Sequence, residues 1–311
     1  MNAQNKIRAA VIGVGYLGKF HAEKYAGLPD VDLIGVADIN EGQARAVAEQ
    51  VGTEAYTDYA ALFGKVDAVS IVVPTPLHHE IARAFLGQGV DVLIEKPITR
   101  TVAEADELIE IAGQKGRIIQ VGHLERFNPA VVAVRELVHD PVFIECNRLS
   151  LYQPRGTEVS VVHDLMIHDI DLILNFVKSG IRYCHALGAP VVTDNVDIAN
   201  AHIEFENGAV ANVTASRISN KSERKIRLFQ QDGYLSIDFA NRSITHIRPG
   251  EGGETCPVPG MQMNTQSFAQ ADALADEIRS FTAAVAQRSA PEVSGRMGRD
   301  ALNIAVNITQ Q

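Results

Sequence analysis

Hydrophobic residues in the first 122 positions form short continuous runs, and the segments between these runs carry apolar residues at helical spacing. The runs occupy residues 7–13, 31–38, 68–73, 91–95 and 118–121, and the helical segments occupy 20–26, 42–51, 76–87 and 101–113. Continuous runs are typical of strands buried on both faces, and intervening helices indicate βαβ crossovers. We therefore predict an α/β domain over residues 1–122, with a doubly wound parallel sheet of the Rossmann type.

The pattern changes after residue 123, where most apolar residues alternate with polar ones. Strands are predicted at 142–149, 197–205, 209–216, 225–229, 234–238 and 243–248, and helices at 130–137, 163–177, 269–286 and 296–308. Asn207-Gly208 and Asp232-Gly233 are hairpin turn signals. Residues 123–311 are therefore expected to form an α+β domain around a large open antiparallel sheet. Its two C-terminal helices are candidates for packing back on the first domain.

A glycine-rich turn follows the first predicted strand. The segment Gly13-Val14-Gly15-Tyr16-Leu17-Gly18 fits the pattern G-x-G-x-x-G between a strand and a helix. Glycines there let the backbone approach a pyrophosphate, whose charge then lies at the helix N-terminus. Asp38 follows Gly18 by 20 residues, where a carboxylate binds the ribose hydroxyls of NAD and repels the 2′-phosphate of NADP. We predict an NAD site formed by Gly13, Gly15, Tyr16, Leu17, Gly18 and Asp38.

The segment Glu95-Lys96-Pro97 ends a predicted strand at the carboxyl edge of the parallel sheet, where open α/β folds bind ligands. Pro97 removes a backbone donor and restricts Lys96 to extended conformations. An ammonium group at this edge can hydrogen-bond a substrate hydroxyl, and burial can lower its pKa so that it relays a proton. The competing interpretation is a surface lysine that pairs with Glu95.

Asp164 and His168 lie four residues apart in a predicted helix and therefore share one of its faces. His168 can accept a hydroxyl proton because the ordinary pKa of histidine lies near neutrality. Asp164 can bind an adjacent hydroxyl or orient the lysine. Two other interpretations are a dipole-stabilised helix start with a packed histidine, and a metal site that adds His163 and Asp169. Helical geometry puts His163 and His168 on different faces, so we expect no metal.

Composition and charge argue against a nucleic-acid-binding protein and a membrane protein. The net charge of −10 argues against a nucleic-acid-binding protein, which needs a basic surface. The chain has no apolar segment of about 20 residues and no signal peptide pattern, so we expect no membrane association. Its three cysteines are widely spaced, as in proteins of a reducing compartment. We expect a cytoplasmic protein whose open, partly apolar sheet face packs on a partner.

Several motifs together resemble those of the Gfo/Idh/MocA oxidoreductase family over nearly the whole chain. They are AVIGVGYLGKFHAEKY near the start, Pro74-Thr75-Pro76-Leu77-His78, Glu95-Lys96-Pro97, Gly122-His123 with Arg126-Phe127-Asn128-Pro129, and Asp164-Leu165-Met166-Ile167-His168 followed by Asp171. The resemblance implies an NAD-dependent dehydrogenase that oxidises a sugar-like hydroxyl. It implies that Lys96, Asp164 and His168 form the catalytic group, with either Lys96 or His168 as the base. It also implies cofactor contacts from Thr75, His78, Glu95 and Lys96.

Within this family, residues 122–129, 154–156 and 164–172 resemble the members that oxidise C3 of UDP-N-acetylglucosamine, upstream of an aminotransferase in lipid A assembly. A UDP-sugar needs donors for its diphosphate, and Arg126 and Arg155 are candidates because guanidinium groups bind phosphate bidentately. Asn128 is a candidate for sugar or uracil contact. Surface salt bridges are the alternative for both arginines. An inositol or free-sugar dehydrogenase and a non-catalytic NAD-binding sensor or regulator are the alternative functions.

Overall fold

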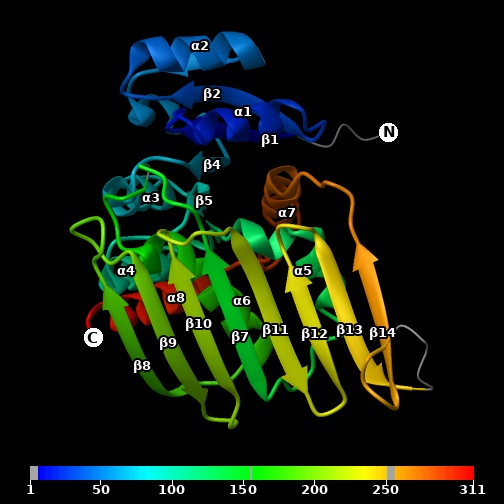
Figure 1. Ribbon diagram of the computed structural model, residues 1–311. Helices are drawn as coiled ribbons and strands as arrows, with labels where there is room; N and C mark the ends of the chain where they lie inside the picture. The colour runs from blue at the N-terminus through cyan, green and yellow to red at the C-terminus, as the bar shows by residue number, and fades with distance from the viewer. Residues whose placement is uncertain (1–5, 155, 251–255) are drawn as a thin grey trace. The chain divides into compact units, whose positions relative to one another are not determined.

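The computed structural model describes residues 6–154, 156–250 and 256–311, and the chain falls into two compact units (Figure 1). Unit 1 contains the chain up to Leu124 together with Asp272–Leu302, and unit 2 contains Glu125–Ala271 together with Asn303–Gln311. The polypeptide therefore leaves unit 1, builds most of unit 2 and then returns. Helix α8 (Gly295–Thr309) begins in unit 1 and ends in unit 2.

Unit 1 is built on a six-stranded parallel sheet with the order β3-β2-β1-β4-β5-β6. Its elements are β1 (Ile7–Ile12), α1 (Gly18–Ala26), β2 (Val31–Ala37), α2 (Glu41–Val51), β3 (Glu54–Tyr56), η1 (Tyr59–Leu62), β4 (Ala68–Ile71), η2 (Thr75–Leu77), α3 (His78–Gly87), β5 (Asp91–Glu95), α4 (Val102–Lys115), β6 (Ile119–Gly122) and α7 (Ala273–Gln287). This topology confirms the predicted doubly wound α/β fold. The strand order reverses between β1 and β4, and open α/β sheets bind ligands at such a switch point, outside the carboxyl ends of the strands.

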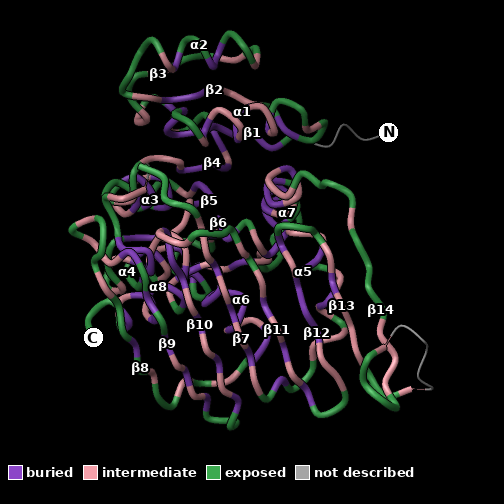
Figure 2. The backbone as a smooth tube through the Cα atoms, in the orientation of Figure 1, coloured by how far each residue is buried: buried purple, intermediate pink, exposed green. Residues whose placement is uncertain are grey.

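Burial on both faces explains why the strands of unit 1 are continuous apolar runs, as the buried stretches in Figure 2 show. Val11 of β1 and Leu93 of β5 belong to one core cluster. Helix α1 adds Tyr25 to this cluster, and α7 adds Ile278 and Phe281. A helix that follows unit 2 in the sequence therefore completes the core around the N-terminal strands.

Unit 2 is built on an eight-stranded sheet with the order β14-β13-β12-β11-β7-β10-β9-β8. Its strands are β7 (Phe143–Leu149), β8 (Ile181–Ala189), β9 (Ile198–Phe205), β10 (Val210–Ser216), β11 (Glu223–Gln230), β12 (Gly233–Asp238), β13 (Ser243–Pro249) and β14 (Met261–Ser267). The pair β7–β10 is parallel and the other neighbouring pairs are antiparallel. The sheet is therefore mixed, whereas the sequence predicted a purely antiparallel one without β8 and β14.

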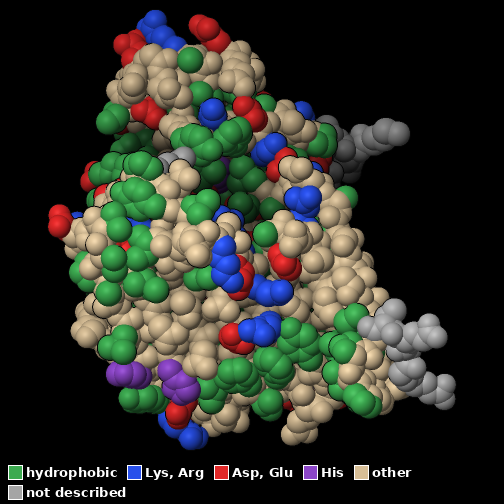
Figure 3. All heavy atoms as spheres, in the orientation of Figure 1, with side chains coloured by type: hydrophobic (Ala, Val, Ile, Leu, Met, Phe, Trp, Pro, Cys, Tyr) green, Lys and Arg blue, Asp and Glu red, His purple; other side chains and the backbone are tan. Residues whose placement is uncertain are grey.

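Helices cover one face of this sheet and leave the other face open. Helix α6 (Ile167–Val177) contacts β7 and β10, and α5 (Pro129–Val134) contacts β12 and β13. Buried and half-buried residues alternate along β7 (Figure 2), as expected for a sheet with one covered face. Charged side chains gather in the middle of the open face (Figure 3). Arg227 of β11 pairs with Glu145 of the neighbouring strand β7 at 2.5 Å. No helix among the described residues combines the length and apolar composition that a bilayer crossing requires.

Candidate active site

The glycine-rich turn and the end of β2 line a cavity of about 370 Å³ in unit 1. Gly13, Gly15 and Asp38 all contribute to its wall. Two backbone donors hold the Asp38 carboxylate there, since the N–H of Val14 donates to Oδ2 and the N–H of Asn40 donates to Oδ1, each at 2.9 Å. Three of the six residues predicted for the NAD site, Gly13, Gly15 and Asp38, therefore share one cavity at the switch point of the sheet.

The turn itself requires glycine. Gly13 has a φ of 84°, and a Cβ there would lie 2.6 Å from the carbonyl oxygen of Val72. A Cβ on Gly18 would overlap the carbonyl oxygen of Gly13. A Cβ on Gly15 would have no neighbour within 4 Å, so this position faces open space. The backbone is thus close-packed on the protein side and open on the cavity side, which suits a dinucleotide phosphate.

Tyr16 and Leu17 lie at the start of α1. Leu17 is the N-cap of this helix, so the helix N-terminus lies directly after the glycine turn. Tyr16 is 65% exposed, and its ring packs edge-on against Phe20. The N-terminal N–H groups of α1 provide partial positive charge beside the cavity, as pyrophosphate binding requires.

The carboxylate of Glu95, at the end of β5, is directed into the interior of unit 1. Its Oε1 lies 3.2 Å from Nε2 of His21, and its Oε2 accepts the N–H of Lys96 at 3.2 Å. A Cβ on Gly122 would come within 3.0 Å of this carboxylate. Burial acts to raise the pKa of Glu95, but the hydrogen bond and charge of His21 outweigh it and lower the pKa. Glu95 therefore holds the backbone at half-buried Lys96, and its implied cofactor contact stays a prediction.

His78 joins two loops of unit 1. Its Nδ1 lies 2.9 Å from the carbonyl oxygen of Pro97, and its Nε2 lies 2.8 Å from that of Val73. Burial lowers the pKa of His78, which is 1% exposed. The imidazole therefore fixes the segment after Lys96 against the loop after β4, and its two nitrogens are both engaged by protein. Thr75 opens η2 next to this contact.

A second carboxyl group lies in the same interior. Glu277 of α7 is completely buried, and neither of its carboxyl oxygens has a hydrogen-bond partner among the described residues. Its carbonyl oxygen accepts from Nε2 of Gln120 at 3.1 Å. Burial, and then the charge of Glu95, raise the pKa of Glu277 well above its ordinary value. Unit 1 therefore contains two carboxyl groups whose pKa values shift in opposite directions, that of Glu95 downward and that of Glu277 upward.

Asp164 and His168 lie on one continuous helical segment of unit 2. Asp164 is in a π-helical turn, η4 (Val162–Met166), and His168 is in α6, which follows without a break. The carbonyl oxygen of Ser160 accepts the N–H groups of His163 and Asp164 at 3.1 Å each, so it closes the first turn. Both Asp164 and His168 are half-buried. Single π-helical turns inside α-helices occur frequently at functional sites.

Two aspartates of α6 form buried ion pairs that the sequence reasoning did not predict. Asp169 accepts from Nε and Nη2 of Arg148 at 3.0 and 2.8 Å, and Arg148 also donates to Glu125 at 3.0 Å. Asp171 accepts from Nε and Nη2 of Arg126 at 2.6 and 2.9 Å. These pairs fix the inner face of α6 against the neighbouring elements, with Asp164 at one end of the helical segment.

Two of the three predicted substrate-binding residues make hydrogen bonds within the protein. Arg126 is 2% exposed and committed to Asp171, so these contacts give it a structural role and do not support diphosphate binding or a surface salt bridge. Asn128 is the N-cap of α5, because its Oδ1 accepts the N–H of Ala130 at 3.1 Å. Arg155 lies outside the described residues.

The predicted catalytic group is divided between the two units. Lys96 belongs to unit 1, whereas Asp164 and His168 belong to unit 2. Each unit is well defined in itself, and the convergence of the three side chains stays a prediction. Among the described residues, no group of three or more His, Cys, Asp and Glu side chains could hold a metal ion.

A sequence signal existed for some of the buried charges. Asp169 and Asp171 stand inside an apolar helical pattern, and charged residues buried on such a face need partners of opposite sign. The pattern therefore indicates that each aspartate has a cationic partner. The structure identifies these partners as Arg148 and Arg126. Glu277 carried a similar signal, because it lies on the buried face of α7.

Two known protein families match separate ranges of the chain. Residues 7–123 match the family described as "Oxidoreductase family, NAD-binding Rossmann fold". Residues 147–236 match the "GFO/IDH/MocA C-terminal domain".

Individual relatives extend this similarity over the full length. The chain is 39% identical over 303 residues to UDP-N-acetylglucosamine 3-dehydrogenase of Acidithiobacillus ferrooxidans, with 97% of this chain and 96% of that protein covered. A solved structure of that enzyme matches with a TM-score of 0.94 at 38% identity, covering 98% and 97% of the two chains. The scyllo-inositol 2-dehydrogenase (NAD(+)) of Bacillus subtilis is 26% identical over 279 residues, 83% of this chain and 82% of that one. Levoglucosan dehydrogenase in complex with NADH shares the fold, with a TM-score of 0.89 at 19% identity and coverage of 98% and 96%.

Proposed function

Because the chain belongs to the Gfo/Idh/MocA family of NAD-binding oxidoreductases, we propose that it oxidises the C3 hydroxyl of UDP-N-acetylglucosamine to a ketone. It is an NAD-dependent dehydrogenase that acts on the CH–OH group of a sugar or nucleotide sugar. The observation that carries the choice of substrate is the 39% identity over 97% of the chain to an enzyme with that activity. The product would supply an aminotransferase that makes a 3-amino sugar for lipid A.

The cavity in unit 1 fits the cofactor. Gly13 and Gly15 let the backbone approach the pyrophosphate, and Asp38 presents a carboxylate that favours the free ribose hydroxyls of NAD. When bound, NAD supplies the acceptor for the hydride that leaves the sugar carbon.

We assign the proton chemistry to the predicted catalytic group. Either Lys96 or His168 takes the proton of the reacting hydroxyl, since an amine or an imidazole can serve as base near neutral pH. Asp164 accepts a hydrogen bond from a neighbouring hydroxyl and so orients the ring. The rigid supports of these side chains favour this assignment, because positioning contributes much of the rate. Glu95 and His78 hold the backbone around Lys96, and Ser160 holds the turn around Asp164.

A substrate panel tests the proposal. The purified protein is mixed with NAD or NADP and with UDP-N-acetylglucosamine, free N-acetylglucosamine or myo-inositol, and reduced cofactor is followed by absorbance. We expect turnover with the UDP-sugar and NAD, and a product that mass spectrometry finds two hydrogens lighter. Turnover with inositol but not with the UDP-sugar would refute the proposed substrate. NAD binding without turnover on any substrate would instead favour the sensor.

A free-sugar or inositol dehydrogenase is the second candidate. One observation favours it: Arg126, a predicted diphosphate donor, is occupied by Asp171. The 26% identity to scyllo-inositol 2-dehydrogenase also supports it. The same panel separates the two candidates.

We also propose that the protein assembles as a homodimer or homotetramer through the open face of the eight-stranded sheet, in the cytoplasm. Exposed apolar side chains at the sheet edge, Tyr183 and Leu187 of β8, favour association. The free thiols of Cys146, Cys184 and Cys256 are in line with a reducing compartment. Light scattering during gel filtration tests the assembly, and a monomeric mass at micromolar concentration would refute it.

A further inference from the structure

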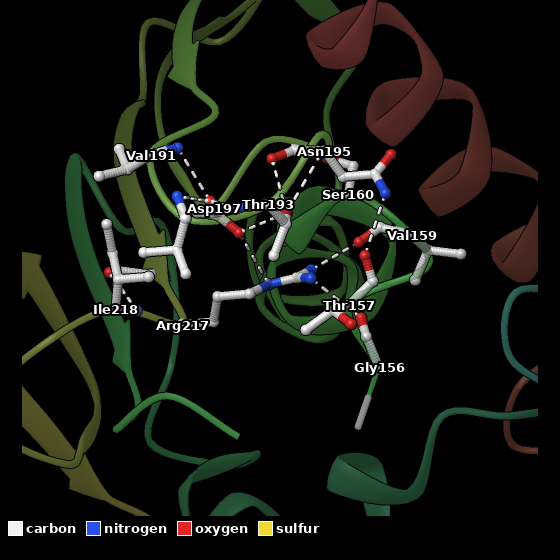
Figure 4. A network of polar contacts seen from close by, with 12 residues as sticks. Gly156, Thr157, Val159, Ser160, Val191, Thr193, Asn195, Asp197, Arg217 and Ile218 are labelled. Atoms are coloured by element: carbon white, nitrogen blue, oxygen red, sulfur yellow. Dashed lines mark hydrogen bonds and ion pairs between the residues drawn. The ribbon is translucent and has the colours of Figure 1, made fainter. Parts of the chain in front are cut away.

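Arg217, the residue after β10, is buried between two segments of unit 2 (Figure 4). Its Nη1 donates to the carbonyl oxygen of Gly156 at 3.0 Å, and its Nη2 donates to that of Val159 at 2.6 Å. Its Nε lies 3.9 Å from Oδ1 of Asp197. One guanidinium therefore ties residues 156–159, which belong to no helix or strand, to the residue that precedes β9.

Asp197 supplies a fixed negative charge for Arg217. Its Oδ2 accepts the N–H groups of Val191, Val192 and Thr193 at 2.9, 2.7 and 2.8 Å, and its Oδ1 accepts the hydroxyl of Thr193 at 2.8 Å. Burial acts to raise the pKa of Asp197, but these donors outweigh burial and lower the pKa far below its ordinary value. The carboxylate thus stays ionised at every working pH, and the turn around it is held by these hydrogen bonds (Figure 4).

The same turn provides a second anchor for the segment 156–161. Nδ2 of Asn195 donates to the carbonyl oxygen of Thr157 at 3.0 Å. The N–H of Val161 donates to the carbonyl oxygen of Val196 at 2.9 Å. The segment is therefore held through its main chain from two sides, by the guanidinium of Arg217 and by residues 195–196.

The segment lies directly against the predicted catalytic carboxylate. Gly156 has a φ of 80°, and a Cβ there would lie 3.1 Å from Oδ2 of Asp164. At the other end of the segment, the carbonyl oxygen of Ser160 accepts the N–H of Asp164. A shift of residues 156–160 would therefore move the backbone that packs against the Asp164 carboxylate. It would also move the Ser160 carbonyl group that binds the start of the π-helical turn.

We propose that Arg217 and Asp197 are positioning residues that hold residues 156–160 against Asp164, so that segment and carboxylate form one preorganised wall of the sugar site. The inference rests on the proposed function, which places Asp164 at the substrate. A guanidinium is suited to this task because its planar donors fix two carbonyls at once. Apolar residues can often replace an ion pair that only contributes to stability. The pair of Arg217 and Asp197 differs because Arg217 also binds the main-chain carbonyl groups of residues 156 and 159.

The test compares Arg217→Lys with Asn195→Ala and with Arg224→Lys, the last a matched control at an exposed position of β11 in the same unit. Lysine keeps the charge but cannot bridge two carbonyls with a planar fork. We expect Arg217→Lys to speed amide hydrogen exchange in residues 156–161 and to raise KM for UDP-N-acetylglucosamine about 10- to 100-fold. KM for NAD should stay near wild type, because the cofactor cavity lies in unit 1. Asn195→Ala should act in the same direction to a smaller extent, and Arg224→Lys should change nothing.

Other outcomes overturn the inference. Unchanged exchange in residues 156–161 would show that Arg217 does not hold the segment. Faster exchange with an unchanged KM for the sugar would show that the segment is held but does not shape the site. If Arg217→Lys does not fold, Asn195→Ala decides the question by the same two measurements. A wild-type enzyme that oxidises no UDP-sugar refutes the proposed function, whereas normal wild-type turnover with unaffected variants refutes this inference alone.

Discussion

Arg126 and Asp171 form a buried bidentate ion pair, with Nε···Oδ2 and Nη2···Oδ1 distances of 2.6 and 2.9 Å. Both side chains are 2% exposed. Removal of one partner would leave an uncompensated buried charge, which costs about 3–5 kcal/mol. We therefore expect Arg126→Met to lower the free energy of unfolding by about that amount, as measured by urea denaturation.

Two further variants test whether an uncompensated buried charge causes this loss of stability. The double variant Arg126→Met/Asp171→Leu should be more stable than the single one, because it buries no charge. Arg83→Met removes an exposed pair with Glu107 and should cost at most about 1 kcal/mol. A single variant as stable as the wild type would contradict the structural role and reopen the diphosphate role of Arg126.

Asp38 is expected to decide between NAD and NADP. The variant Asp38→Ser removes the charge that repels a 2′-phosphate and one acceptor for the ribose hydroxyls. We expect KM for NAD to rise about tenfold, which corresponds to roughly 1.4 kcal/mol, and KM for NADP to fall. Steady-state kinetics with both cofactors measure this. Asp106→Asn, an exposed variant paired with Arg299, is the control. A preference for NAD that survives in Asp38→Ser would place cofactor selection elsewhere.

Lys96 and His168 are the two candidates for the base. Loss of a general base reduces turnover by about 10²–10⁴-fold, so we expect Lys96→Met or His168→Asn to reduce kcat to that extent with little change in NAD affinity. The pH profile of kcat/KM separates the candidates, since the variant that loses the base also loses the acidic limb of the profile. Lys115→Met, at the end of α4, is the control. Full turnover in Lys96→Met would remove this lysine from the mechanism.

The raised pKa of Glu277 predicts a stability that depends on pH. Above the ordinary pKa of 4.5, the unfolded chain releases this proton while the folded protein keeps it. The folded state then binds more protons, so its stability falls as pH rises from 4.5 toward the folded pKa, with a slope of at most about 1.4 kcal/mol per pH unit.

The neutral variant Glu277→Gln removes this dependence. The melting temperature of Glu277→Gln minus that of the wild type should therefore increase as pH rises above the ordinary pKa of 4.5. Glu49→Gln, on the exposed face of α2, should show a difference that does not change with pH. A flat difference for Glu277→Gln would mean that the carboxyl group is ionised or hydrated in the folded protein.

The sequence predicted those elements whose periodicity is strong. The five apolar runs of unit 1 became β1, β2, β4, β5 and β6 because strands buried on both faces need nearly continuous apolar residues. β3 was missed because it has three half-buried or exposed residues, and β14 because its sequence MQMNTQS is largely polar and exposed. The parallel pair β7–β10 was missed because hairpin signals report only neighbours in the sequence.

Site residues were harder to predict than elements, for a related reason. A guanidinium that binds a diphosphate and one that binds a buried aspartate are the same residue type, so Arg126 could not be assigned without its partner Asp171. The π-helical turn at Asp164 is not encoded in apolar spacing. The glycine turn and Asp38 were predictable because their backbone demands restrict the residue types directly.

The return of α7 to unit 1 has a consequence for how the protein is made on the ribosome. The core around β1 includes Ile278 and Phe281, which are synthesised after nearly all of unit 2. Domains commonly fold in order of synthesis, N-terminal first. Here the apolar core of the nucleotide-binding domain stays exposed on the nascent chain until residues 278–285 have been synthesised. A chain released before that point would expose this apolar surface and would be a target for chaperones or proteases.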